Sequence, residues 1–281
     1  METMEQLQEC VVAGHEMAYR RQGRGEPVVL LHGITTYSFI WRRLVPLLGD
    51  SYDLIMPDLL GCGDSAMPFN TDYSIKTHAR LIREFVDQLG LDRFHLVGHD
   101  VGGGVAQVYA VNNPETLASL TLINTVAYDF WPVQPIIAMR TPILRQMAMA
   151  TLDLGAFRII VRRGIHRKDR VTDELMSLFW YPMKRDRGRK AFLHFARSLN
   201  NEHLLEISDQ LRNLEVPTLV VRGDADPYLC AEIAEKLQRE IPGARLERIA
   251  DGSHFIQEDQ PERLAEVIGA HLRDHLMGLD S

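Results

Sequence analysis

The chain has 281 residues, 46% of them hydrophobic, which is enough to bury a large core in a single α/β domain. Its formal net charge is -7 and its 31 basic residues are spread along the chain, so the sequence offers no basic patch for nucleic acid or an anionic membrane. The longest apolar runs, such as 28–31 and 219–221, have the length of strands, not of membrane-spanning helices. We therefore expect a monomer or homodimer whose partner is a small molecule.

Cysteine usage and the N-terminal residues indicate a reducing compartment. Cys10, Cys62 and Cys230 lie far apart and lack the spacing of metal ligands. The first residues do not form the basic and then apolar segment of a secretion signal. The sequence also contains no phosphate-binding glycine loop, so we expect a cytoplasmic protein with no metal and no organic cofactor.

Short β-branched runs alternate with amphipathic helical patterns along most of the chain. The strand-like runs are Val28–Leu31, Leu54–Met56, Phe94–Val97, Leu120–Ile123 and Leu219–Val221. Apolar residues recur at helical spacing in 75–89, 231–241 and 262–272. This alternation predicts an α/β fold with a mostly parallel sheet flanked by helices.

From about residue 127 to residue 212 the strand rhythm disappears. The segment is compatible with helices and is rich in Met, Arg and aromatic residues, including Trp131, Met139, Met147, Met149, Phe179, Trp180, Tyr181 and Met183. An insertion at the carboxyl ends of the strands would close over the usual ligand site of such a sheet and exclude water. We predict a core domain of residues 1–126 and 213–281 and a helical cap, 127–212, inserted after the sixth strand. Methionine-rich packing suits a small hydrophobic organic substrate.

Gly98-His99-Asp100-Val101-Gly102-Gly103 directly follows a predicted strand and opens a helix. Small residues on both sides of a central side chain are typical of the strained turn that exposes a nucleophile. This position usually carries serine, and Asp100 changes the chemistry, because a carboxylate is already ionised and attacks without a base. The predicted product of its attack on saturated carbon is an ester of Asp100, which water must then hydrolyse.

Hydrolysis of that ester requires a histidine base and a group that orients it. His254 lies after the last predicted strand and before the C-terminal helix, and Asp226 lies in the loop after the strand at 219–221. We prefer Asp226 to Asp224 because it lies one step further into the loop. The end of the preceding strand carries Asn124, so no carboxylate competes there.

An oxyanion hole is the remaining requirement, and backbone amides can provide it. His32-Gly33-Ile34 ends another predicted strand. We expect the amides of Ile34 and Val101 to form the hole, with no role for their side chains.

Together these motifs resemble the branch of the α/β-hydrolase superfamily that contains haloalkane dehalogenases and epoxide hydrolases. The matching stretches are His32-Gly33 with Trp41 downstream, Pro57–Ser65, the Asp100 turn, Gly223–Pro227 and Gly252–His254. The resemblance covers nearly the whole chain. It implies the α/β-hydrolase fold, the catalytic set Asp100, His254 and Asp226, and a hydrolase that needs only water as a second substrate.

Departures from the family pattern bear on the leaving group. Haloalkane dehalogenases typically have halide-donating side chains where this chain has Ile34 and Val101, and neither of these can donate a hydrogen bond. Epoxide hydrolases usually have proline at the position of Thr35. The arginines that hold the carboxylate of fluoroacetate are absent from residues 101–105, which disfavours that substrate.

An epoxide opens to a basic alkoxide and needs a proton donor, which in this family is a tyrosine of the cap. The predicted cap holds Tyr181, our first candidate, and Tyr128. Epoxide hydrolysis is therefore the first interpretation. Haloalkane dehalogenation, with Trp41 or Trp180 as halide donor, is the alternative, although the cap aromatics are also explained by packing alone. A catalytically silent ligand-binding homologue is a third interpretation, and the presence of Asp100 and His254 argues against it.

Overall fold

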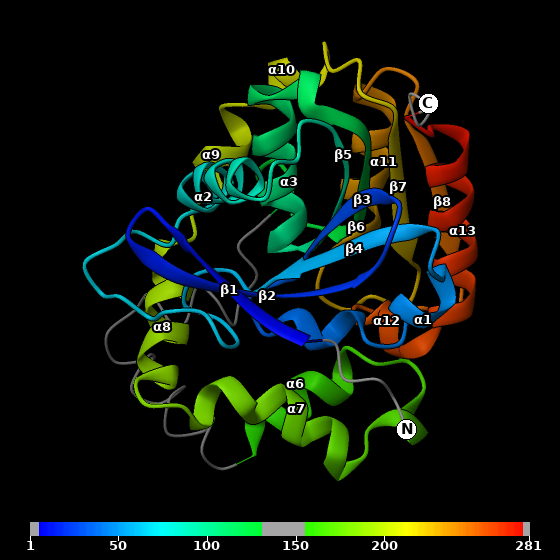
Figure 1. The fold of residues 1–281 in the computed structure, drawn as a ribbon. Helices are drawn as coiled ribbons and strands as arrows, with labels where there is room; N and C mark the ends of the chain where they lie inside the picture. Colours follow the sequence, from blue (N-terminus) through cyan, green and yellow to red (C-terminus); the bar gives the residue numbers. More distant parts are fainter. Residues whose placement is uncertain (1–5, 131–154, 278–281) are drawn as a thin grey trace.

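The computed structural model describes residues 6–130 and 155–277, and its centre is an eight-stranded sheet with the order β1-β2-β4-β3-β5-β6-β7-β8 (Figure 1). The strands are β1 (Gln6–Val12), β2 (His15–Gly23), β3 (Glu26–Leu31), β4 (Tyr52–Pro57), β5 (Phe94–Asp100), β6 (Leu117–Thr125), β7 (Thr218–Gly223) and β8 (Arg245–Ile249). Only the β1–β2 and β2–β4 pairs are antiparallel, and all other neighbours are parallel. The predicted mostly parallel sheet is confirmed.

The central strands are the ones that the sequence predicts, because their side chains are buried on both faces of the sheet. Every residue of β4, β5, β6 and β7 is buried. Three strands are missing from the prediction. In β8 most residues are exposed or half-buried, and in β1 and β2 a short apolar stretch, Cys10–Val12 or Met17–Tyr19, adjoins several polar residues, so none of the three is an apolar run over most of its length.

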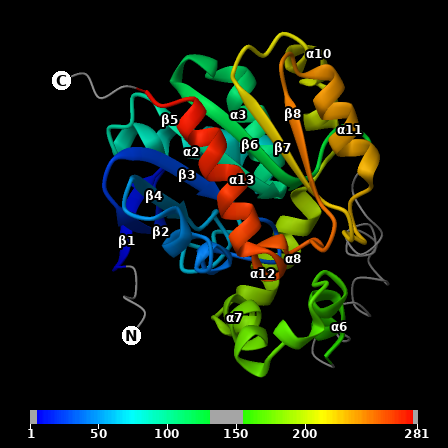
Figure 2. The same cartoon turned by 90° about the vertical axis from the view of Figure 1, so that its right-hand side faces the viewer.

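Helices cover both faces of the sheet. The helices α2 (Ile75–Gln88) and α3 (Val101–Asn112) pack against each other on one face, and α13 (Pro261–Asp274) packs with the short α1 (Val45–Leu48) on the other (Figures 1 and 2). The helix α11 (Ala231–Glu240) packs against β7 and β8. The predicted helices 75–89, 231–241 and 262–272 therefore agree with α2, α11 and α13 within two residues at each end.

The segment predicted as a cap is helical wherever the structure describes it. It contains α6 (Ala156–Arg163), α7 (Asp173–Lys184), α8 (Gly188–Ser198), α9 (Glu202–Leu205) and α10 (Ser208–Leu211). The helices α6 and α7 lie beyond one end of the sheet, beside the short α12 (Ile256–Asp259) (Figure 1). Residues 131–154, with Trp131, Met139, Met147 and Met149, lie outside the described residues.

None of the helices in the described ranges is long and apolar enough to cross a membrane.

Candidate active site

Asp100 lies at the junction of β5 and α3 in a conformation that few side chains adopt. Its φ of 53° and ψ of -121° place it at a strained turn, as the predicted nucleophile position requires. Two glycines make this turn possible. A Cβ atom on Gly98 would lie 2.5 Å from the Gly102 carbonyl oxygen, and one on Gly102 would lie 2.4 Å from the His32 carbonyl oxygen. The glycine pattern in the sequence thus reflects the close approach of helix and strand.

Backbone amides surround the carboxylate of Asp100, which is only 7% exposed. The amide of Ile34 donates to Oδ2 at 3.2 Å, and the amide of Val101 also hydrogen-bonds to the carboxyl group. Burial raises the pKa of Asp100 above its usual value, although His254 and these two amides oppose the shift. The structure therefore places the two predicted oxyanion-hole amides at the carboxylate of Asp100, the predicted nucleophile.

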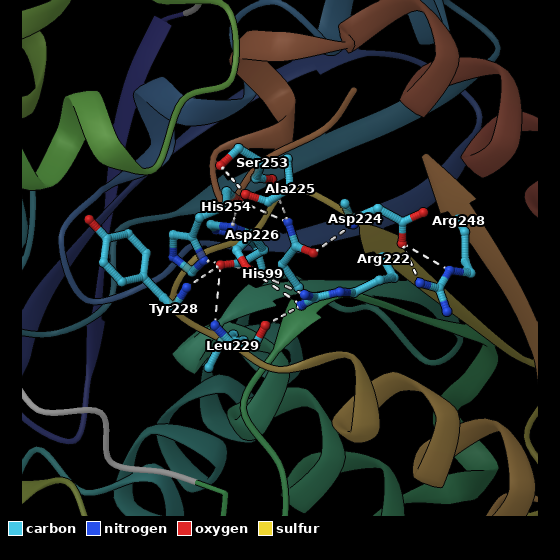
Figure 3. Close-up of polar contacts among 12 residues, drawn as sticks. His99, Arg222, Asp224, Ala225, Asp226, Tyr228, Leu229, Arg248, Ser253 and His254 are labelled. Carbon is cyan, nitrogen blue, oxygen red and sulfur yellow. Dashed lines mark hydrogen bonds and ion pairs between the residues drawn. The ribbon is translucent and has the colours of Figure 1, made fainter. Parts of the chain in front are cut away.

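His254 lies beside a buried carboxylate (Figure 3). Its Nδ1 is 3.0 Å from Oδ2 of Asp226, and both residues are less than 10% exposed. Oδ1 of the same carboxylate accepts hydrogen bonds from the amides of Tyr228 at 2.8 Å and Leu229 at 3.2 Å. Asp226 thus holds the Nδ1–H tautomer of His254 and leaves Nε2 as the basic nitrogen.

The two charges of this pair shift each other's proton affinity. Burial alone would raise the pKa of Asp226, but His254, the Tyr228 amide and Arg222 outweigh it and lower that pKa. Burial alone would lower the pKa of His254, but Asp226 and Asp100 outweigh it and raise that pKa. Both carboxylates therefore favour the protonated form of the His254 imidazole.

The neighbouring carboxylate, Asp224, points away from the histidine. Its Oδ1 accepts a hydrogen bond from Nε of Arg248 at 2.8 Å, and both side chains are about one-third or more exposed. The preference for Asp226 over Asp224 thus agrees with the geometry (Figure 3).

Three buried side chains that the sequence interpretation did not select hold the histidine loop. Asn124 donates from Nδ2 to the carbonyl oxygens of Ser253 at 2.8 Å and of His254 at 3.0 Å. His99 approaches the same His254 oxygen with Nε2 at 2.9 Å. Asn124 also accepts from the Gly223 amide, so it connects the ends of β6 and β7 to the histidine loop. Their types alone gave no signal, because a buried Asn or His is most often a packed polar residue.

The third of these residues, Asp259, attaches the helical segment to the same loop. Its carboxylate accepts hydrogen bonds from the amides of Ser253, His166 and Arg167, all at 2.9 Å. The amide of Phe255 donates to the Gly164 carbonyl at 2.9 Å. The segment after α6 is therefore held directly against the loop that carries His254.

The two tyrosines predicted as leaving-group donors contact other side chains in the structure. The hydroxyl of Tyr181 donates to Oδ1 of Asp64 at 2.5 Å, and its side chain is 38% exposed. The ring of Tyr128 faces α11, where Nζ of Lys236 lies 3.9 Å from the ring centroid, and burial and the nearby Glu240 raise the pKa of this tyrosine. The role of these two hydroxyls as leaving-group donors stays a prediction.

The two tryptophans take different positions. Trp180 packs against Phe157 with ring centroids 5.3 Å apart and lines an open surface pocket of about 350 Å³ between α6 and α7. Its role as a halide donor stays a prediction. Trp41 is fully buried in the short helix η1 (Ser38–Trp41), and its Nε1 has no hydrogen-bond partner among the described residues.

No group of three or more His, Cys, Asp and Glu side chains could hold a metal ion within residues 6–130 and 155–277.

Comparison with known proteins supports the family interpretation. The family model of the alpha/beta hydrolase fold matches residues 26–159. Haloalkane dehalogenase 2 of Mycobacterium tuberculosis is 31% identical over 263 residues, which cover 89% of each chain. A soluble epoxide hydrolase of a Corynebacterium species is 35% identical over 130 residues, 44% of this chain and 45% of the relative.

A solved structure agrees with the same assignment. The crystal structure of the putative ancestral haloalkane dehalogenase AncHLD2 superposes with a TM-score of 0.85 at 27% identity and covers 97% of this chain and 100% of its own. With the fold, the strained Asp100 turn and the His254–Asp226 pair, these similarities show that the chain belongs to the α/β-hydrolase superfamily, in the branch of the haloalkane dehalogenases and epoxide hydrolases.

Proposed function

We propose that the protein is a hydrolase in which Asp100 attacks an electrophilic sp3 carbon and His254, oriented by Asp226, activates the water that completes the reaction. The observation that carries this proposal is the position of the Asp100 carboxylate, with Oδ2 held by the Ile34 amide in the predicted oxyanion hole. In a serine enzyme the hole faces the substrate carbonyl. Here the carbonyl that must be stabilised is that of Asp100 itself.

The first step is a displacement at carbon. Oδ1 of Asp100, the oxygen not held by Ile34, forms a bond to the substrate carbon, and the bond from that carbon to the leaving group breaks with its electron pair. Asp100 becomes a neutral ester, so one of the two carboxylates that held the proton on His254 is lost. The charge of Asp100 raises the pKa of His254, so conversion of Asp100 to an uncharged ester favours the neutral imidazole.

The second step hydrolyses the ester. Nε2 of His254 takes a proton from water, and the resulting hydroxide attacks the Cγ carbon of Asp100. The negative charge then develops on Oδ2, which the amides of Ile34 and Val101 stabilise. Collapse of the intermediate releases the alcohol and restores the Asp100 carboxylate, while Asp226 stabilises the imidazolium.

Residues 127–212 act as the cap in this proposal. Their contact with the catalytic histidine loop through Gly164, His166 and Arg167 supports that role. A cap at this end of the sheet would exclude bulk water from the ester. The substrate class that we propose is a small hydrophobic organic molecule, and the proposed location is the cytoplasm.

An epoxide is the first substrate class that we propose. The side chains of Ile34 and Val101 are apolar and buried beside the nucleophile, so neither offers a hydrogen bond to a halide. In the observed arrangement the Tyr181 hydroxyl donates to Asp64 and the Tyr128 ring faces Lys236, so we assign the ring-opening proton to neither of them here and to no other residue.

Haloalkane dehalogenation is the second candidate, and two observations favour it. The Mycobacterium tuberculosis relative that spans 89% of this chain is named as a haloalkane dehalogenase. The indole N–H of Trp41 is buried without a partner among the described residues, as an unoccupied halide donor would be.

Trapping of the ester separates these candidates. His254→Phe lacks the base, so its ester with an aryl epoxide should persist and add the whole mass of the epoxide to the protein. An ester formed from a bromoalkane should add the substrate mass less hydrogen bromide, because bromide leaves and the carboxyl group loses its proton. The double variant Asp100→Asn, His254→Phe is the matched control and should gain no mass. If no member of a broad epoxide and haloalkane panel modifies the His254→Phe protein, the nucleophile assignment is wrong and a silent binding protein becomes the better interpretation.

A further inference from the structure

A buried arginine lies behind the catalytic acid. Arg222 is a residue of β7, directly before the loop that carries Asp226, and it is only 5% exposed. Its Nη1 lies 3.7 Å from Oδ2 of Asp226, the same oxygen that His254 contacts (Figure 3). Burial of a guanidinium is costly unless it has a structural or chemical role, so this placement needs an explanation.

The guanidinium also connects the two ends of the acid loop. Nη1 donates to the Leu229 carbonyl at 2.5 Å, and Nη2 donates to the Asp226 carbonyl at 3.4 Å. The same loop holds Oδ1 of Asp226 with the amides of Tyr228 and Leu229. Arg222 therefore links the backbone carbonyls of Asp226 and Leu229, while the amides of the same loop bind Oδ1 of the Asp226 carboxylate.

We propose that Arg222 is a positioning residue that holds the Asp226 loop against His254 and supplies the positive charge that lets His254 release its proton once Asp100 is esterified. This inference rests on the proposed function. Its electrostatic part follows from the charges around the imidazole. Asp226 and Asp100 favour the imidazolium, and Arg222 opposes it. After esterification only Asp226 still favours the charged form, so Arg222 then opposes the single remaining carboxylate.

The other titratable side chains that face the His254 ring are neutral and do not supply this positive charge. The ring of His99 lies 5.1 Å from that of His254, but burial lowers the pKa of His99 to about 3, so it is neutral. The ring of Tyr228 lies 5.2 Å away, and burial raises its pKa to about 12, so it is neutral too. Among the described charged groups that shift the pKa of His254, Asp226 and Asp100 are anions and Arg222 is a cation.

The direct test is the titration of His254 by NMR, with its ring signals assigned by their loss in His254→Phe. Arg222→Met removes the charge and should raise the pKa of His254 by about one unit. Arg222→Lys keeps the charge and should leave that pKa within about 0.3 unit of the parent value. The matched control Arg248→Met removes the cation that pairs with Asp224 instead, and it should also leave the titration unchanged.

A second measurement follows the chemistry. The rate of ester hydrolysis is measured in single-turnover experiments as a function of pH. Its fall on the acid side should occur at a pH about one unit higher in Arg222→Met than in the parent. Arg222→Lys should show an unshifted profile with a lower maximum, because its single ammonium cannot hold both loop carbonyls. A protein whose only defect is loose packing would lose rate without this shift.

The two measurements fail in different ways. If His254 titrates identically in the parent, Arg222→Met and Arg222→Lys, the inference about Arg222 is wrong whatever the reaction is. If the NMR shift appears but no substrate ever forms an ester, the effect of the Arg222 charge on His254 stands, and the proposed function is wrong together with the role of Arg222 after esterification. An equal shift in Arg248→Met would assign the effect to general surface charge and also overturn the inference.

Discussion

Gly33 lies so close to Asp100 that a single methyl group there should disable the nucleophile. A Cβ atom at this position would lie 2.4 Å from Oδ2 and 2.7 Å from Cβ of Asp100, well inside contact distance. The backbone of Gly33 has no left-handed φ, so alanine is excluded by contact and not by backbone strain. The carboxylate of Gly33→Ala must therefore turn away from the Ile34 amide, which now donates to it at 3.2 Å.

The size of the effect follows from two losses. A misplacement of the attacking oxygen by about 1 Å costs about 100-fold in rate, and the loss of one oxyanion donor costs about 100- to 1,000-fold. We expect attack to slow by at least about 100-fold and ester hydrolysis to slow by a similar factor. Intact mass spectrometry of Gly33→Ala in the His254→Phe background measures attack alone, as the rate at which the adduct appears.

A control and a refuting result complete this test. Gly269→Ala changes a glycine of α13 whose added Cβ would meet the flexible end of Arg273 at 3.2 Å and lie in ordinary contact with Leu48 at 3.8 Å, so its adduct should form at the parent rate. Thermal unfolding of both variants shows whether either has lost its fold. If a folded Gly33→Ala protein forms the adduct within about threefold of the parent rate, Oδ2 does not occupy the position described here.

Further substitutions test the neighbouring contacts. Asp226→Asn should slow ester hydrolysis by about 1,000- to 10,000-fold in single-turnover kinetics, whereas Asp224→Asn should hydrolyse at the parent rate because its partner is on the surface. Asp259→Leu removes the acceptor of three amides, including that of buried Ser253, and should lower the free energy of urea unfolding by about 3 kcal/mol, and an unchanged unfolding midpoint would contradict this bonding pattern. Tyr181→Phe removes only a hydroxyl that contacts Asp64, so substrate turnover should stay within about twofold of the parent, and a large loss would restore Tyr181 as a proton donor.

The parts of the fold that could be predicted from the sequence are those with continuous apolar runs or strong helical periodicity. The central strands and α2, α11 and α13 have such patterns. The edge strand β8, with Arg245, Glu247 and Arg248, does not, because an edge strand exposes much of its surface to water. Its pairing with β7 comes from tertiary contacts that local sequence does not encode.

The same distinction applies to the site. Asp100, Asp226 and His254 each follow a strand in a glycine-containing turn, so their positions follow from the topology of the sheet. Residues that act from a distance follow no such rule. Tyr181 was predicted as a proton donor from its segment and residue type. The orientation of its hydroxyl depends on how α7 packs, and in the structure this hydroxyl donates to Asp64. Arg222 was missed because an arginine inside a strand gives no signal until its buried partner is known.

The central claim is that the substrate carbon is transferred to Asp100 before water attacks, and oxygen labelling tests it most directly. One turnover of excess protein with an epoxide or a haloalkane in water enriched in oxygen-18 should leave the product alcohol with an oxygen from Asp100. The peptide that contains Asp100 should gain about two mass units, because water attacks the carboxyl carbon of the ester. Label in the product and none in that peptide would show that His254 directs water at the substrate itself, and would contradict the nucleophilic role of Asp100.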